Sequence, residues 1–177
     1  GEWVSFVDSD DWVESDILES MYKTALLSGS SLVTCDFIEI KNRSVMYCNS
    51  FDWTRESGVD VNTLSKKELL EVVLSLSYGV VWNLLIDRKL IESLSFDVNL
   101  KYGEDNLFLF KLHMRTNKHF HLRRYLYHYD RTNEKSLSNN KTLDYHINNL
   151  TVSCELLSLL SKLDSILPDL YVLKPKQ

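Results

Sequence analysis

The most constraining feature of this sequence is an apolar segment that runs directly into a cluster of acidic residues. Residues 3–7 (WVSFV) have the composition of a strand, and Asp8, Asp10 and Asp11 follow immediately. Carboxylates that end a buried strand are costly unless a cation lies among them. Because ligands bind at the carboxyl ends of strands in open α/β sheets, we expect this turn to mark both the fold class and a binding site.

Size and composition exclude several kinds of protein. The chain has 177 residues, which is enough for one domain, or for one domain with a tail. A hydrophobic share of 44% with only two prolines predicts an ordered core. The net charge of −5, with dispersed lysines and arginines, argues against nucleic acid as a partner. Three cysteines without metal-type spacing, and no apolar run long enough to span a bilayer, indicate a cytoplasmic protein.

Hydrophobic periodicity predicts a mixed α/β order of elements rather than a regular alternation. The capping box of Ser65 and Glu68 is a clear helix start, because each side chain can bind an amide of the first turn. The expected elements, in chain order, are a helix from Ser15 to Gly29, strands over 32–40 and 44–48, a helix that begins at Ser65, an extended segment over 80–86, a helix that begins at Glu104, a strand over 119–129 and a long helix over 143–163.

The acidic turn taken alone has three interpretations. It is a solvated turn, since aspartate is common in turns. Alternatively, it is the site of a haloacid-dehalogenase-like phosphatase, in which one aspartate attacks phosphorus and another supplies the proton. As a third alternative, it binds Mg²⁺ or Mn²⁺, which prefer oxygen ligands, and through the ion the diphosphate of a nucleotide sugar. The motif by itself leaves all three open.

Two further pairs of residues have the chemistry of a sugar-processing site. Glu104 and Asp105 open a helix, where one carboxylate can act as a base while its neighbour holds local structure. Acidic residues are also favoured in a first turn by the helix dipole alone. Trp82 and Asn83 place an aromatic face beside an amide, which suits a sugar ring and its hydroxyls. A tryptophan in an apolar run is, however, more often part of the core.

The C-terminal half of the sequence contributes two weaker candidates. Arg131 lies in a loop that ends near Ser136, and its planar guanidinium could bind a phosphate or simply be solvated. His119 and His121 occupy one face of the expected strand and could bind a metal. A histidine pair without a third ligand is more often structural.

Together these motifs resemble the inverting family 2 glycosyltransferases of the GT-A fold, of the bacterial surface-polysaccharide type. The resemblance extends over roughly residues 1–138. The segments that carry it are Gly1–Trp12, Thr34–Phe37, Val81–Asn83, Tyr102–Asn106 and Tyr127–Arg131. Five motifs in the expected order are far more specific than any one of them.

The resemblance implies that the chain is the C-terminal part of a GT-A fold, a mixed sheet flanked by helices. Residues 1–139 would be the catalytic part and 140–177 a helical tail. The family's opening strand and its base-reading loops would precede Gly1. We therefore expect a fragment that is weakly active or inactive alone.

The resemblance also implies an activity, which is transfer of a hexose from a nucleotide-diphosphate donor, a UDP-sugar, to an acceptor hydroxyl with inversion. Asp10 and Asp8 would bind Mn²⁺ or Mg²⁺, and Asp105 would be the general base. The donor would contact Asp8, Asp11, Arg131 and Ser136, and the acceptor would contact Trp82, Asn83 and Glu104.

The acceptor would be a glycan or a lipid-linked sugar, so peripheral contact with the inner face of the membrane is expected, as is a homo-oligomer. Two other hypotheses stay open, which are the phosphatase and a non-catalytic carbohydrate-binding or assembly module.

Overall fold

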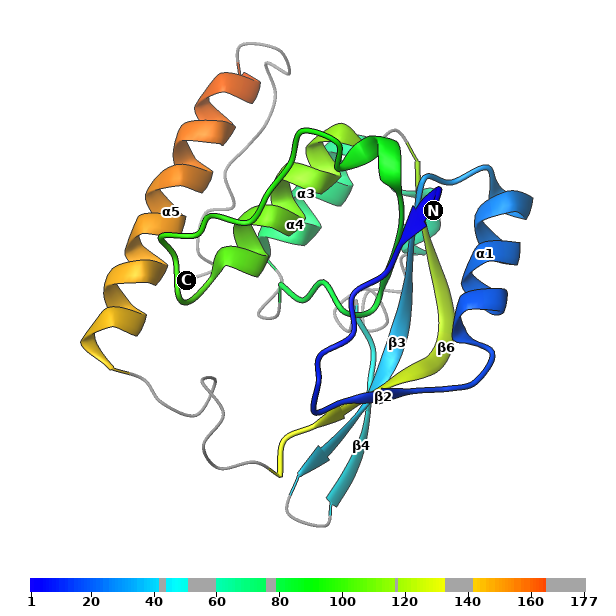
Figure 1. The fold of residues 1–177 in the computed structure, drawn as a ribbon. Coiled ribbons are helices and arrows are strands. Elements are labelled where there is room, and N and C mark those ends of the chain that lie inside the picture. The colour runs from blue at the N-terminus through cyan, green and yellow to red at the C-terminus, as the bar shows by residue number, and fades with distance from the viewer. Residues whose placement is uncertain (42–43, 51–59, 76–78, 117, 133–141, 165–177) are drawn as a thin grey trace.

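The structure, a computed structural model, describes residues 1–41, 44–50, 60–75, 79–116, 118–132 and 142–164. These residues form a six-stranded mixed sheet with helices on both faces (Figure 1). The α/β fold class predicted from the sequence is therefore confirmed.

The sheet is built around one parallel pair of long strands. Its strands are β1 (Trp3–Val4), β2 (Trp12–Val13), β3 (Leu32–Lys41), β4 (Ser44–Cys48), β5 (Leu84–Asp87) and β6 (His119–Asp130). The order is β1-β5-β3-β6-β2, with β4 also paired to β3. β3 runs parallel to β6, and every other pair is antiparallel.

Helices cover the two faces of this sheet unequally. They are α1 (Ile17–Ser28), α3 (Lys66–Ser75), α4 (Glu104–Arg115) and α5 (Leu143–Asp164), with two short 3₁₀ helices, η1 (Val61–Thr63) and η2 (Arg88–Leu90). α1 lies on one face, and α3 and α4 lie on the other, with α5 outside α4 (Figure 1).

Along the central strands, successive side chains alternate between the two faces of the sheet, and this explains why helices cover both faces. Leu32 and Ile86 belong to the apolar cluster that includes α3 and α4, whereas the adjacent Val33 and Leu85 pack with α1. Successive strand side chains point to opposite faces. Because the residues on both faces are apolar, each face has to be buried by helices.

Most predicted helix boundaries are confirmed. The Ser65 N–H donates to Glu68 Oε2 over 2.8 Å, and the Glu68 N–H donates to Ser65 Oγ over 3.3 Å, as expected of a capping box. Gly29 ends α1 in the left-handed region, with φ 66°. The N-cap of α1 is Asp16, however, and the prediction of Ser15 is wrong. The Asp16 carboxylate accepts bonds from Ser20 and Arg124 rather than from an amide.

Two predicted extended segments are shorter than expected. β1 contains only Trp3 and Val4 of the expected 3–7 segment, and β5 begins at Leu84 rather than at residue 80. The Ser5 hydroxyl donates to the Leu84 carbonyl over 2.8 Å, and Phe6 then packs on α4. The chain therefore leaves the sheet early because its next apolar side chain, which is partly buried, packs against a helix.

The long C-terminal helix is confirmed as α5, but only part of its broad apolar face is buried. The sequence predicts burial of a stripe of Ile147, Leu150, Cys154 and Leu157, broadened by Leu156, Leu159, Leu160 and Leu163. The first four residues are exposed, and that part of the prediction is wrong. Leu156, Leu159 and Leu160 face the rest of the molecule as expected, together with Val152. Within the described residues no helix combines the length and the apolar character needed to cross a bilayer.

Candidate functional site

The acidic turn after β1 is attached to β6 through Tyr127. The Asp8 N–H donates to Tyr127 Oη over 3.1 Å, and Tyr127 Oη donates to Asp11 Oδ2 over 2.6 Å. Asp11 Oδ1 also accepts the N–H of Asp130 over 2.8 Å. The carboxylate of Asp11 is thus engaged by protein groups, whereas Asp8 and Asp10 remain exposed at the surface of the turn.

Tyr127 is in turn fixed by the aromatic core behind it. Its ring stacks on Trp82 with 4.2 Å between centroids, and Phe37 meets Trp82 edge-on at 4.9 Å. The Tyr127 residue is fully buried, so its hydroxyl has little freedom to move. Sequence reasoning assigned no role to Tyr127, although it opens one of the segments that carry the family resemblance.

The structure places Trp82 and Asn83, the predicted acceptor residues in the turn before β5, in the interior. Trp82 is 4% exposed and Asn83 is 3% exposed. The Asn83 side-chain amide donates to the Cys35 carbonyl over 3.0 Å and to Ser50 Oγ over 2.7 Å. These contacts connect the turn to β3, and acceptor binding by either residue stays a prediction.

The start of α4 brings a second pair of carboxylates toward the acidic turn. Gly103 precedes Glu104 with φ 79°, a left-handed conformation that glycine adopts readily. Phe6 lies edge-on to Phe108 of α4 with 6.2 Å between ring centroids, and this contact packs the segment before Asp8 onto the helix. The turn and the helix start are therefore neighbours.

The electrostatics couple the acidic turn to the start of α4. Burial, together with the charges of Glu104 and Asp8, raises the pKa of Asp105 to about 7. The pKa of Asp8 is raised by partial removal from water, then by Asp11 and Asp10. Burial also raises the pKa of Glu104. A carboxylate with a pKa near 7 can exchange a proton at neutral pH, as a general base must.

The acidic turn suits a hard divalent ion in its chemistry but forms no complete cage. No group of three or more His, Cys, Asp or Glu side chains in the described part of the chain is arranged to bind a metal. Mg²⁺ is commonly bound by one or two carboxylates together with substrate phosphates. Asp8 and Asp10 therefore fit such an ion when phosphate oxygens complete its coordination.

Arg131 lies beside β3 rather than in an open loop. Its Nη1 is 3.2 Å from Oε1 of the buried Glu39, and the guanidinium lies 5.9 Å from the ring centre of Tyr129. Among the described residues its buried Nε has no hydrogen-bond partner. Ser136, the other predicted donor contact of this loop, lies outside the described residues.

The histidine pair forms part of the core. Thr34 Oγ1 lies 2.9 Å from His119 Nε2 and 2.9 Å from His121 Nδ1, and all three residues are buried. His121 Nε2 is 3.1 Å from Asp36 Oδ1. These contacts support the structural interpretation of the pair.

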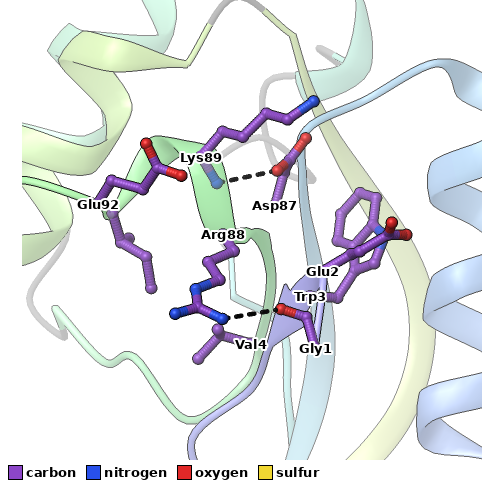
Figure 2. A pocket seen from close by; sticks show the side chains of 9 residues that line it. Gly1, Glu2, Trp3, Val4, Asp87, Arg88, Lys89 and Glu92 are labelled. Atoms are coloured by element: carbon purple, nitrogen blue, oxygen red, sulfur yellow. Dashed lines mark hydrogen bonds between the residues drawn. The ribbon is translucent and has the colours of Figure 1, made fainter.

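A pocket of about 630 Å³ lies at the β1 edge of the sheet, apart from the acidic turn (Figure 2). Arg88 Nη1 approaches the Gly1 carbonyl at 3.5 Å there, and the Lys89 N–H donates to Asp87 Oδ1 over 3.0 Å. Since none of the predicted site residues lines this pocket, the candidate site is the exposed acidic turn and the start of α4.

Comparison with known proteins finds glycosyltransferases. The chain is 29% identical over 141 residues to glycosyltransferase GlyA of Streptococcus pneumoniae, a match of 78% of the chain and 20% of GlyA. It is 31% identical over 134 residues to EpsH of Bacillus subtilis, which is also named as a glycosyltransferase, a match of 73% of the chain and 37% of EpsH. The chain thus spans well under half the length of either relative.

Solved structures show the same fold. The crystal structure of TarS residues 1–349 from S. aureus with UDP-GlcNAc has a TM-score of 0.64 and 20% sequence identity, and the match covers 89% of the chain and 43% of that TarS fragment. A search of protein-family profiles found no match. The chain is therefore similar in sequence to glycosyltransferases and has the fold of part of a GT-A glycosyltransferase.

Proposed function

We propose that the protein transfers a sugar from a nucleotide-diphosphate donor to an acceptor hydroxyl in glycan biosynthesis. The observation that carries the proposal is that the segment before Asp8 packs on α4 through Phe6 and Phe108, which brings the acidic turn near enough for the charge of Asp8 to raise the pKa of Asp105. Similarity to GlyA and EpsH favours sugar transfer over the phosphatase. The fold shared with TarS, solved with UDP-GlcNAc and with UDP, supports a UDP-sugar as the donor.

In this proposal Asp105 takes the proton from the acceptor hydroxyl as it attacks the sugar carbon. Its raised pKa suits that task, because a base with a pKa near the working pH combines ionisation with proton affinity. An in-line attack inverts the sugar carbon and requires the base and the leaving diphosphate on opposite sides of it. Glu104, next to Asp105 on the helix, would contact the acceptor.

The donor diphosphate would lie at the acidic turn. Asp8 and Asp10 would hold Mn²⁺ or Mg²⁺, which when bound would offset the negative charge that develops on the departing diphosphate. Tyr127 and Asp11 would keep the turn in place without contacting the ion. Without a cation, the raised pKa of Asp8 indicates that its charge is disfavoured by burial and by its acidic neighbours.

The test is turnover and binding in two variants, made in the protein as it is naturally encoded. Asp105→Asn should abolish UDP release from a UDP-sugar while calorimetry still detects UDP with Mn²⁺. Asp10→Asn should weaken the binding of UDP with Mn²⁺. Wild-type turnover in Asp105→Asn would overturn the proposal. Sugar binding indifferent to Mn²⁺ and to nucleotide would instead favour a non-catalytic carbohydrate-binding module.

A further inference from the structure

α5 is joined to the start of α4 by a specific polar contact as well as by apolar packing. The Asn148 side-chain oxygen accepts the Lys101 N–H over 2.8 Å and the Tyr102 N–H over 3.1 Å. These successive backbone groups lie immediately before Gly103, the N-cap of α4. A side chain of one helix thereby fixes the turn that leads into another.

Two further contacts with α5 hold the same turn, residues 101–103, in place. The Tyr102 ring meets Tyr145 of α5 edge-on with 5.4 Å between centroids. Gly103 approaches α5 so closely that an added Cβ would lie 3.2 Å from Val152 Cγ2. Gly103 also has a positive φ, so this turn has a demanding backbone conformation and little room.

The turn sets where Glu104 and Asp105 lie. Within the part of the chain that the structure describes, no side chain caps the N-terminus of α4, so the first turn of the helix depends on the preceding backbone for its position. Asp105 lies only a few residues after Lys101 and Tyr102, whose amides bind Asn148. A shift of those amides would therefore also shift the Asp105 carboxylate. Displacement of a reacting group by about 1 Å can cost about 100-fold in rate.

We propose that Asn148 is a positioning residue, through which α5 holds the α4 start in the geometry that the chemical step requires. The inference rests on the proposed role of Asp105 as the base. It makes α5, which the sequence predicts as a helical tail, part of the catalytic unit. Asn148 acts through the backbone of residues 101–103 and does not itself contact a substrate.

The first test measures the hydrogen bonds from the Lys101 and Tyr102 amides to Asn148, independently of catalytic activity. In Asn148→Ala the amides of Lys101 and Tyr102 lose their acceptor, so their hydrogen exchange should become at least about tenfold faster. Thr151→Ala is the matched control, because the Thr151 hydroxyl donates only within α5, to the Ile147 carbonyl at 3.0 Å. Unchanged exchange of the 101–103 amides in Asn148→Ala would overturn the inference.

The second test measures the consequence for turnover. With UDP-GlcNAc, UDP-glucose and UDP-galactose as donors, Asn148→Ala should lower kcat by up to about 100-fold with the donor KM little changed. Asn148→Asp keeps an acceptor oxygen at the same place and should restore most of the rate. Equal kcat in Asn148→Ala and wild type would overturn the inference, as would failure of Asn148→Asp to recover activity.

Controls separate this inference from the proposed function. If Asp105→Asn is inactive while Asn148→Ala is fully active, only the positioning role fails. If Asp105→Asn retains turnover, the proposed function itself fails. Should Asn148→Ala not fold, Asn148→Thr, whose hydroxyl cannot reach both amides, takes its place in both tests.

Discussion

The hydroxyl of Tyr127 lies between Asp8 and Asp11, accepting the N–H of the first and donating to the carboxylate of the second over 2.6 Å. The ring that bears this hydroxyl stacks on Trp82 in the interior. The exposed acidic turn is therefore held by one atom, the hydroxyl oxygen of Tyr127, which lies at the boundary between the aromatic core and the surface.

Tyr127→Phe should loosen the acidic turn while keeping the stacked ring. The Asp8 N–H and the Asp11 carboxylate each lose a partner, which we expect to lower the free energy of unfolding by about 1 kcal/mol. Calorimetry should show weaker binding of UDP with Mn²⁺. Tyr125→Phe is the control, since its hydroxyl donates to Asn49 Oδ1 at 3.2 Å. Equal affinity in both variants would contradict a role for Tyr127 in holding the turn.

The pH dependence of turnover should report Asp105. Its pKa of about 7 means that lower pH protonates the base, so kcat/KM should fall as pH drops below 7 and level off above it. Glu104→Gln removes a charge that raises this pKa, and the acidic limb should move to lower pH. A profile of UDP release that is flat between about pH 5.5 and 8.5 would exclude Asp105 as the base.

His113 should make the fold less stable in mild acid, in opposition to Asp105, whose raised pKa makes protonation favour the folded state over the same range. Burial lowers the pKa of His113 from 6.5 to about 4, so the folded state holds it neutral. The folded pKa lies below the unfolded one, and the stabilisation is therefore complete above pH 6.5 and decreases as pH falls toward 4. The loss for this residue at about pH 5 is about 2 kcal/mol.

Urea unfolding of wild type and His113→Asn at about pH 7.5 and about pH 5 isolates this loss. On going from the higher to the lower pH, wild type should lose more stability, or gain less, than His113→Asn, because the amide cannot become charged and can still donate to the Leu109 carbonyl. His146→Gln, an exposed change on α5, should leave the pH dependence of wild type unaltered. The same pH dependence in His113→Asn would assign the effect to another group.

Substitution of Arg131 and Glu39, singly and together, can distinguish a structural role of Arg131 from a role in donor binding. Glu39 is buried and its partner is largely buried, so Arg131→Ala and Glu39→Ala should each destabilise the fold, and the double variant by less than the sum. If Arg131 also contacts the diphosphate, only Arg131→Ala should weaken UDP affinity beyond the effect shared with Glu39→Ala. Additive losses in unfolding experiments would show that the pair is not coupled.

The local elements of the fold could be predicted from the sequence because their signals are local. The capping residues Ser65 and Glu68, the stop at Gly29 and the helix start at Glu104 each depend on neighbours a few positions away. The acidic turn and Asp105 were also found as candidates, because their residue types are typical of the chemistry.

The contacts that assemble the site could not be predicted, because they join residues distant in the sequence. Whether Trp82 stacks on Tyr127 or on a sugar depends on the register of strands that a pattern does not specify. The same holds for Asn148, whose amide would be expected on a solvated helix face. The amphipathic pattern of α5 likewise could not show which part of its broad apolar face packs on α4.

The parallel pairing of β3 with β6 affects how this chain folds during its synthesis. Thr34 meets His121, 87 residues further along, at the middle of the sheet. Parallel strands have to wait for a long crossover, and such distant contacts slow folding. On the ribosome, β3 therefore emerges long before its main neighbour exists and leaves an apolar strand without cover. Chaperone engagement during translation is expected to matter more for this protein than for one stabilised mainly by local contacts.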